Sequence, residues 1–596
     1  MKTSFSDRIN THEAALKKMT PLFNFVGYGK LLGILLLGAL VYFIFARSFP
    51  IGLLVVGVFV LAGNVALWIY HYKLHRKMKF LSGIIAINRR HLDRMHDKWI
   101  TFSDTGSEFI DREHPYSGDL DIVGKKSFFQ FLNTTHTWHG RQAFANDLLQ
   151  PNYNENEITT RQNAIAELNK DIDFSNKMEY AFSQIGQHRS IEKLFDELNN
   201  NQPFINNKII KSLFMYMPIL TFIFASTVLL FQLENLRPAA IIIIAIQVFI
   251  WSYWMRATHS YLKVLSHLPY KLNAYSQVIS IIKSKPFDAE ILKKIQAQLS
   301  NDEASAEQAI KELDKIANKV RIRHNILLWV LLNALLLWDI ECAVAFEKWK
   351  KKYAPVAEEW FVALGNIESL LSFSILPLIC NHTCLPVVST AKKMSAQALG
   401  HPLISNKIRV NNDIFCEDAI FIISGSNMSG KTTFMRTVGI NLVLARAGSY
   451  VCAKSMHFPL LHMMTSMRVA DDLNEGISTF YAELKRIKNI ITLAEKHPRM
   501  IFLIDEIFRG TNSIDRLSGA KAVLSTLDKL GAMGIITTHD LELCEIATSY
   551  PRIQNHSFSE EYRDNKIYFD YTIKPGKSTT TNAKYLMQMV GIRPTT

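Results

Sequence analysis

A glycine-rich segment in the C-terminal third of the chain carries the residues best suited to chemistry. An apolar run, Ala419 to Ile423, precedes it, and an apolar-periodic stretch, Phe434 to Ala447, follows it, which predicts a buried strand and then a helix. In this setting backbone N–H groups and the helix N-terminus face phosphate oxygens. The segment fits G-x-x-x-x-G-K-[ST], and its candidate nucleotide-binding residues are Gly425, Ser426, Asn427, Met428, Ser429, Gly430, Lys431, Thr432 and Thr433.

Within that segment, two side chains have distinct expected roles. Lys431 is expected to reach the β- and γ-phosphates, and the Thr432 hydroxyl is expected to bind Mg²⁺. Gly425 and Gly430 allow the backbone conformations that a phosphate loop needs. The pattern therefore predicts a nucleoside triphosphate with a magnesium ion.

Two carboxylates follow an apolar run downstream of the loop. The run Met500 to Ile504 ends at Asp505 and Glu506, which predicts a strand with acids at its carboxyl end. Asp505 is expected to hold Mg²⁺ through water or through Thr432, so the predicted metal residues are Thr432 and Asp505. Glu506 is expected to orient or deprotonate the attacking water.

A third apolar run, Gly534 to Thr538, ends at His539. Because ligands of open α/β sheets bind at the carboxyl ends of strands, His539 is expected to sense the γ-phosphate. The predicted catalytic residues are Glu506, His539 and Lys431. Leu517 to Ala520 reads Leu-Ser-Gly-Ala, which superficially resembles the signature of transporter ATPases. In those ATPases the signature precedes the Asp-Glu strand, whereas here it follows, so we interpret it as part of a helix without a catalytic role.

Two pairs of long apolar runs predict four membrane helices in two hairpins. Leu31 to Ala46 and Ile51 to Tyr70 form the first pair, and Leu213 to Phe231 and Pro238 to Met255 form the second. Lysine and arginine concentrate outside the hairpin turns, which puts both ends of each hairpin in the cytoplasm. A buried soluble hairpin is the alternative for the first pair. A shorter apolar run, Ile326 to Trp338, is expected to be a buried core helix.

The composition agrees with an intracellular, membrane-attached protein. The 596 residues include 67 Lys+Arg and 53 Asp+Glu, a net charge of +14, which suits an anionic partner such as nucleic acid or an anionic membrane surface. Positive-inside bias beside the membrane segments would also account for it. The six cysteines predict no disulfide framework and no metal site, and the polar N-terminus does not read as a signal peptide. We expect a multi-pass protein of the cytoplasmic (inner) membrane.

The expected fold is multidomain. It combines an α-helical core and lever domain, two transmembrane hairpins and a C-terminal α/β nucleotide-binding domain that faces the cytoplasm. The expected segments are a cytoplasmic segment at 1–22, a hairpin at 23–72, helical core at 80–205, a hairpin at 213–255, helical core and lever at 257–395 and the α/β domain at 396–596.

These motifs, in this order, resemble the MutS family. The loop GSNMSGKTT is similar to that family's GPNMGGKST, and the Asp-Glu and Thr-Thr-His segments resemble its M-D-E and A-T-H segments. The resemblance extends roughly over residues 115–170 and 325–593. The matching segments are 127–151, 400–413, 425–433, 471–484, 503–515 and 537–540.

The resemblance implies an ABC-type P-loop ATPase that uses ATP and Mg²⁺, works as a homodimer and binds DNA in mismatch repair. It implies that Ser478 acts on the partner subunit's nucleotide. It also implies lever helices and a DNA clamp, yet only about 70 residues lie between the second hairpin and Ile326. The family's mismatch-reading N-terminal domain, which carries a Phe-x-Glu wedge, is replaced here by a hairpin, and we expect no Phe-x-Glu wedge before residue 400.

Three functions therefore stay open. The first is a membrane-anchored ATPase coupled to DNA, and the second is a mechanochemical or scaffold ATPase that acts on a membrane partner. The third is a transport ATPase, which the position of Leu517 to Ala520 and the small number of membrane spans disfavour. No small-molecule substrate other than ATP is expected.

Overall fold

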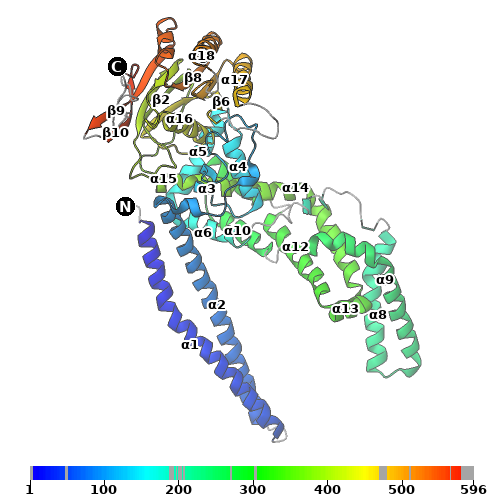
Figure 1. Cartoon of the computed structure of the whole chain (residues 1–596). Coiled ribbons are helices and arrows are strands. Elements are labelled where there is room, and N and C mark those ends of the chain that lie inside the picture. The colour runs from blue at the N-terminus through cyan, green and yellow to red at the C-terminus, as the bar shows by residue number, and fades with distance from the viewer. Residues whose placement is uncertain are drawn as a thin grey trace.

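The computed structural model describes most of the chain and shows a helical body that carries an α/β domain and two helical arms (Figure 1). Both arms extend from the body on the side away from the α/β domain. The description covers residues 4–46, 51–186, 194–195, 197–198, 204–205, 208–266, 268, 272–300, 305–468, 479–508, 512–563 and 566–578.

The arms are pairs of long helices. The first arm pairs α1 (Phe5–Ala46) with α2 (Ile51–Met95), and the second pairs α8 (Lys208–Leu230) with α9 (Arg237–Ser266). By length and composition α1, α2 and α9 are able to cross a membrane, with only 6% to 11% of their most apolar windows buried. The described part of α8 supplies a shorter apolar helix, Tyr216–Leu230. The predicted turn at residues 47–50 lies outside the described residues.

The helical body consists of short helices around one long helix, α14 (Trp338–Ser374). Although α14 and the following α15 are apolar, 78% of their most apolar window is buried, so they belong to the core. Side-chain oxygens of Ser127, Thr137, Asn154 and Asp171 cap the N-termini of the first four body helices. The body helices are α3 (Phe128–Leu132), α4 (Trp138–Leu149), α5 (Glu155–Lys170), α6 (Ile172–Ser183), α10 (Leu272–Ser284), α11 (Glu290–Ser300), α12 (Ala306–Val320) and α15 (Leu376–Ile379).

The helix predicted to be buried between Ile326 and Trp338 is not buried. The observed helix, α13 (Ile326–Leu336), lies beside α8 and α9 (Figure 1), and five of its apolar side chains are exposed. The prediction was wrong because it took an apolar helix too short to span a membrane to be part of the protein core. Short 3₁₀ turns join the elements: η1 (Lys98–Thr101), η2 (Ser107–Phe109), η3 (Glu234–Leu236), η4 (Arg321–His324) and η5 (Leu543–Thr548).

The α/β domain contains two sheets. A six-stranded sheet has the order β10-β9-β4-β8-β7-β6, in which β6, β7, β8, β4 and β9 run parallel and β10 is antiparallel to β9. Its strands are β4 (Ile420–Ser424), β6 (His462–Ser466), β7 (Met500–Asp505), β8 (Met533–Thr538), β9 (Ile553–Arg563) and β10 (Lys566–Pro575). Every residue of β4, β7 and β8 is buried, as expected of parallel strands that are covered on both faces.

The second, four-stranded sheet has the order β1-β5-β2-β3, formed by β1 (Val387–Ser389), β2 (Lys393–Leu399), β3 (Asn412–Glu417) and β5 (Ser455–Pro459). Its first strand begins before the predicted domain start at residue 396. Three helices complete the domain: α16 (Lys431–Arg446), α17 (Thr479–Lys496) and α18 (Ser513–Lys529). The Leu517 to Ala520 segment lies inside α18, as predicted.

Candidate functional site

The glycine loop joins the central strand β4 to α16. Gly425 has φ +149° and Gly430 has φ +105°, which are backbone angles that favour glycine. A Cβ atom on Gly425 would lie 2.7 Å from the carbonyl oxygen of Phe558, so a side chain there would clash with the neighbouring strand. The loop is thus held close to β9, and its backbone amides lead into the N-terminus of α16.

Lys431 is buried against the loop that it follows. Its ammonium donates hydrogen bonds to the carbonyl oxygens of Gly425 at 2.8 Å and Ser426 at 2.7 Å. The Ser426 hydroxyl donates to the buried Glu560 carboxylate at 2.9 Å. Glu560 on β9 therefore ties the loop to the sheet, a role that no sequence motif indicated.

A hydroxyl and a carboxylate meet at the start of α16. Thr432 Oγ1 donates to Asp505 Oδ1 at 2.9 Å, and Thr537 Oγ1 donates to the same oxygen at 2.5 Å. Because β7 and β8 are adjacent, with Asp505 opposite Thr537, the carboxylate is fixed at the carboxyl edge of the sheet. These oxygen donors fit Mg²⁺, which takes one or two carboxylates together with substrate phosphates.

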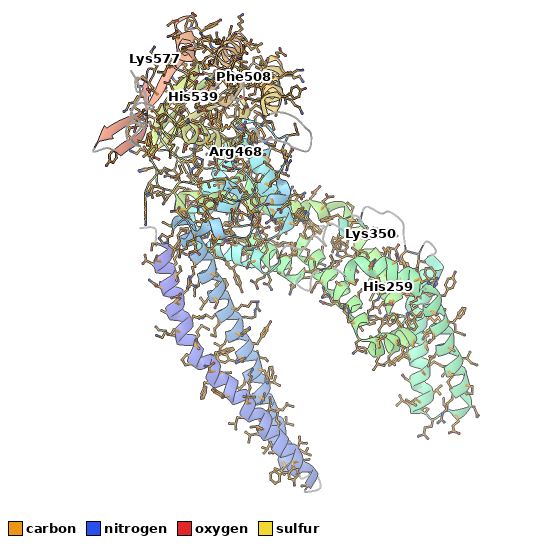
Figure 2. The ribbon with its side chains drawn as sticks, in the orientation of Figure 1. His259, Lys350, Arg468, Phe508, His539 and Lys577 are labelled. Carbon is orange, nitrogen blue, oxygen red and sulfur yellow. The ribbon has the colours of Figure 1, made fainter. Side chains whose placement is uncertain are left out.

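Glu506 and His539 lie together beyond the same edge. His539 Nδ1 is 3.6 Å from Glu506 Oε1, and Figure 2 shows His539 within the α/β domain. Glu506 has φ +53°, an unusual angle for a residue with a side chain, of the kind found at functional sites. Its side chain borders a cavity of about 310 Å³ together with His539 and the Arg516–Asp540 ion pair.

Glu506 also lines a second cavity of about 600 Å³, whose lining includes the glycine loop from Ser426 to Thr433. One wall of this cavity is apolar and fits a flat heterocycle such as a nucleobase. Sequence reasoning missed this wall because its residues come from distant segments: Ile408, Val410, Phe558 and Tyr571.

Asn555 to Phe558, Asn-His-Ser-Phe, stands where the MutS family has N-x-H, with its histidine displaced by one position, and that histidine does not line the cavity. The His556 ring packs on Phe421 with the ring centroids 4.2 Å apart, and burial lowers the pKa of His556. Phe558 lines the cavity and contacts Phe434 at the start of α16. The aromatic contribution of this segment to the cavity is therefore a phenylalanine.

Ser478, the residue predicted to act on a partner's nucleotide, lies outside the described residues, as does the rest of 469–478. Arg468, immediately before this segment, lies at the boundary between the α/β domain and the helical body (Figure 2).

An acidic segment of the body contacts the α/β domain there. Asp121 accepts hydrogen bonds from Arg436 Nη1 at 2.9 Å and from Arg468 at 2.6 and 2.9 Å. Asp119 accepts from the Thr465 hydroxyl at 2.6 Å and from the backbone amides of Met467 and Arg468. The body is therefore hydrogen-bonded both to α16, which begins at the glycine loop, and to the end of β6.

Arg436 connects this contact to Asp505, the candidate metal ligand. Burial and the neighbouring Arg468 lower the pKa of Arg436, while Asp121, Asp119 and Asp505 act in the opposite direction. Arg436 lies four residues after Thr432, on the same face of α16. Arg436 thus interacts with carboxylates of both the helical body and the candidate site.

The structure brings together all the predicted site residues that it describes. The glycine loop, Lys431, Thr432, Asp505, Glu506 and His539 surround the two neighbouring cavities. Sequence reasoning missed Asp121, Arg436, Glu560 and the apolar wall, since each acts through a contact between segments that no short spacing reveals.

Comparison with known proteins assigns the C-terminal region. Residues 421–593 match the family model described as MutS domain V. The chain is similar to "DNA mismatch repair protein MutS" of Myxococcus xanthus (strain DK1622), with 32% identity over 252 residues, which are 40% of this chain and 28% of that protein. The protein of the same name from Aquifex pyrophilus is 35% identical over 184 residues, 30% of this chain and 21% of that protein.

A third such relative, from Lactobacillus johnsonii (strain CNCM I-12250 / La1 / NCC 533), is 28% identical over 250 residues, 41% of this chain and 29% of that protein. The chain thus spans less than a third of the length of these relatives.

Proposed function

Since this chain belongs to the MutS family through its C-terminal region, we propose that it is a membrane-anchored, MutS-like ATPase whose nucleotide cycle is coupled to DNA binding. One observation carries the enzymatic part of the proposal. The Thr432–Asp505 hydrogen bond brings a hydroxyl and a carboxylate that suit Mg²⁺ together at the glycine loop, next to Glu506 and His539.

The proposed roles follow from these positions. The loop amides and Lys431 bind the phosphates of ATP, and Thr432 and Asp505 hold Mg²⁺, which supplies charge neutralisation at the phosphates. Glu506 would orient or deprotonate the attacking water, and His539, whose Nδ1 lies 3.6 Å from Glu506 Oε1, would sense the γ-phosphate. The apolar wall with Phe558 and Tyr571 receives the base.

A homodimer completes the proposed site. In this arrangement Ser478 of one subunit reaches the nucleotide of the other, as the family resemblance implies. The four arm helices anchor each subunit in the cytoplasmic membrane, with the α/β domain in the cytoplasm. This orientation is supported by the basic residues that flank the arms and by the exposed apolar surface of the arm helices.

A membrane partner in place of DNA is the second candidate function. Helices α10 to α12 have only 11 to 15 residues each, so they offer no long clamp helix. The chain does contain one Phe-x-Glu triplet before residue 400, Phe195-Asp196-Glu197. However, Phe195 is buried in the body against His139 and Phe361, a position unsuited to a mismatch-reading wedge.

Hydrolysis tests the enzymatic part. We expect Glu506→Gln to lower the turnover number about 100- to 10,000-fold with ATP binding retained, because the change removes a general base and little volume. We expect Lys431→Ala to abolish nucleotide binding. The exposed Glu545→Gln serves as the matched control. Turnover unchanged in Glu506→Gln would refute the assignment.

DNA binding separates the two functions. The purified protein in detergent is titrated with duplex, mismatched and branched DNA, with and without ATP, across a salt series. Nucleotide-dependent binding with a steep salt slope, about −0.9 per phosphate contact, supports the DNA role. Intact hydrolysis with no DNA binding at low salt would support a membrane partner.

A further inference from the structure

Helix α13 presents an apolar surface that the rest of the fold leaves exposed. Ten of its residues are apolar, and the eleventh, Asn333, is buried. Ile326 is 68% exposed, Leu327 82% and Leu331 54%. A surface of this kind on a soluble protein marks a binding site for something apolar.

The length of α13 excludes a membrane crossing. Eleven residues at about 1.5 Å per residue extend about 16 Å, roughly half of the ~30 Å hydrocarbon thickness. A helix of this length is suited to lie in one leaflet or at the boundary between headgroups and acyl chains.

Tryptophan contacts position α13 at the base of the second arm. The Trp329 ring contacts the Trp251 ring of α9, with centroids 5.1 Å apart, and Trp254 of α9 contacts Phe214 of α8 at 5.8 Å. Trp251, Phe214 and Leu337 belong to one buried cluster at the base of the arm. Tryptophan is enriched where a membrane meets water.

A polar cluster lies at the same level, on the side of the body. Asp339 accepts hydrogen bonds from Trp329 Nε1 at 3.0 Å and from Arg323 Nε at 3.0 Å, and its backbone amide donates to Asn333 at 2.9 Å. Of the basic residues shortly before α13, Arg321 is buried, Arg323 is paired with Asp339, and His324 is exposed. The polar contacts of α13 thus lie on its buried side, while its apolar side chains stay exposed.

We propose that α13 is embedded in the cytoplasmic leaflet of the membrane beside α8 and α9, as a third, non-spanning element of the second arm. The proposal rests on the membrane anchoring proposed above. The bilayer is the occupant of the exposed face because that face continues the apolar surface of α8 and α9, with which α13 is in contact. Leaflet contact then fixes the start of α14, which begins directly after Leu337 and runs through the body.

Lipid quenching of a fluorescent label tests this placement. The full-length protein carrying Leu327→Cys is labelled with NBD, reconstituted into vesicles of phosphatidylcholine and phosphatidylglycerol, and exposed to lipids with nitroxide quenchers at shallow or deep positions. Unsubstituted protein gives the background labelling. Phe249→Cys on α9 is the membrane reference, and Lys315→Cys on α12 is the aqueous control, since both native side chains are exposed.

We expect at least two-fold quenching at position 327, stronger with shallow than with deep quenchers, and none at position 315. Quenching at 249 without quenching at 327 overturns the proposal but leaves the membrane anchor intact. A blue-shifted label at 327 without lipid quenching also overturns it and indicates that a second copy covers α13. Absence of quenching at both 249 and 327 refutes the membrane anchor itself.

Discussion

At the residue scale, Asp121 links the helical body to Asp505, the proposed metal ligand. It binds Arg436 and Arg468 together, and Arg436 in turn interacts electrostatically with Asp505. Without Asp121, the guanidinium of Arg436 is compensated by Asp119 and Asp505, and Asp505 is also the proposed Mg²⁺ ligand. A carboxylate of the body thereby offsets part of the positive charge next to Asp505.

We therefore expect Asp121→Asn to raise the Mg²⁺ concentration for half-maximal ATP hydrolysis about ten-fold, equivalent to about 1.4 kcal/mol. The measurement is a magnesium titration of hydrolysis at saturating ATP. The same change at the exposed Asp288 is the control. An unchanged magnesium requirement in a folded Asp121→Asn protein would show that Asp121 acts only as a structural contact.

His401, which lines the cavity at the glycine loop, makes the folding stability depend on pH. Burial, followed by the nearby Arg436, lowers the pKa of His401 to about 4. Below its ordinary pKa of about 6.5 the unfolded chain binds a proton that the folded chain does not, so stability falls as the pH drops from 6.5 towards 4. Above pH 6.5 His401 contributes no pH dependence.

At pH 5 this difference amounts to about 2 kcal/mol. We expect the melting temperature of the unsubstituted protein to fall more between pH 7 and pH 5 than that of His401→Asn. The exposed His259→Asn, on α9 (Figure 2), should keep the full dependence. Equal slopes in His401→Asn and the unsubstituted protein would contradict the prediction.

At the element scale, α14 and α4 pack at very close range. A Cβ atom on Gly365 of α14 would lie 2.7 Å from the backbone carbon of His139, and one on Gly140 of α4 would lie 2.2 Å from the Glu368 carboxylate. Glu368 accepts a 2.7 Å hydrogen bond from the His136 amide and also bonds Thr137. The glycines therefore allow a buried carboxylate to fix the N-terminus of α4.

We expect Gly365→Ala to destabilise the body by about 1–3 kcal/mol, because the backbone of His139 must move to admit the methyl group. Thermal unfolding followed by circular dichroism measures this loss. Gly118→Ala is the matched control, since a Cβ atom there meets nothing within 4 Å. Similar melting temperatures for the two variants would mean that the helices separate at little cost.

At the scale of the whole molecule, the two arms extend from the same side of the body, away from the α/β domain (Figure 1). If both arms are membrane hairpins, the α8–α9 turn at η3 lies outside the cytoplasm. The body and the α/β domain then remain on the cytoplasmic side.

Chemical labelling of intact cells measures this topology. A membrane-impermeant maleimide should modify Glu234→Cys in η3 before lysis and Lys293→Cys in α11 only after lysis, since both native side chains are exposed. Five of the six native cysteines are buried, which keeps the background low. Labelling of Lys293→Cys in intact cells would reverse the proposed orientation.

Short-range patterns made much of the α/β domain predictable. The glycine loop, the Asp505–Glu506 pair and His539 each follow a buried strand, and parallel strands in one sheet necessarily bring such ends to one edge. The long apolar runs also predicted the arm helices, because the length of an apolar run can be counted in the sequence and compared with the length needed to cross a membrane.

The sequence by itself determined these elements, their order and the chemistry at the strand ends, since each depends on residues close together along the chain. Tertiary structure alone decided three things: the contact of Asp121 with Arg436, the apolar wall around Phe558 and Tyr571, and the exposure of α13. The physical reason is the same for all three. Each depends on which distant segments pack together and which surface stays uncovered, and apolar character does not distinguish burial in protein from burial in lipid.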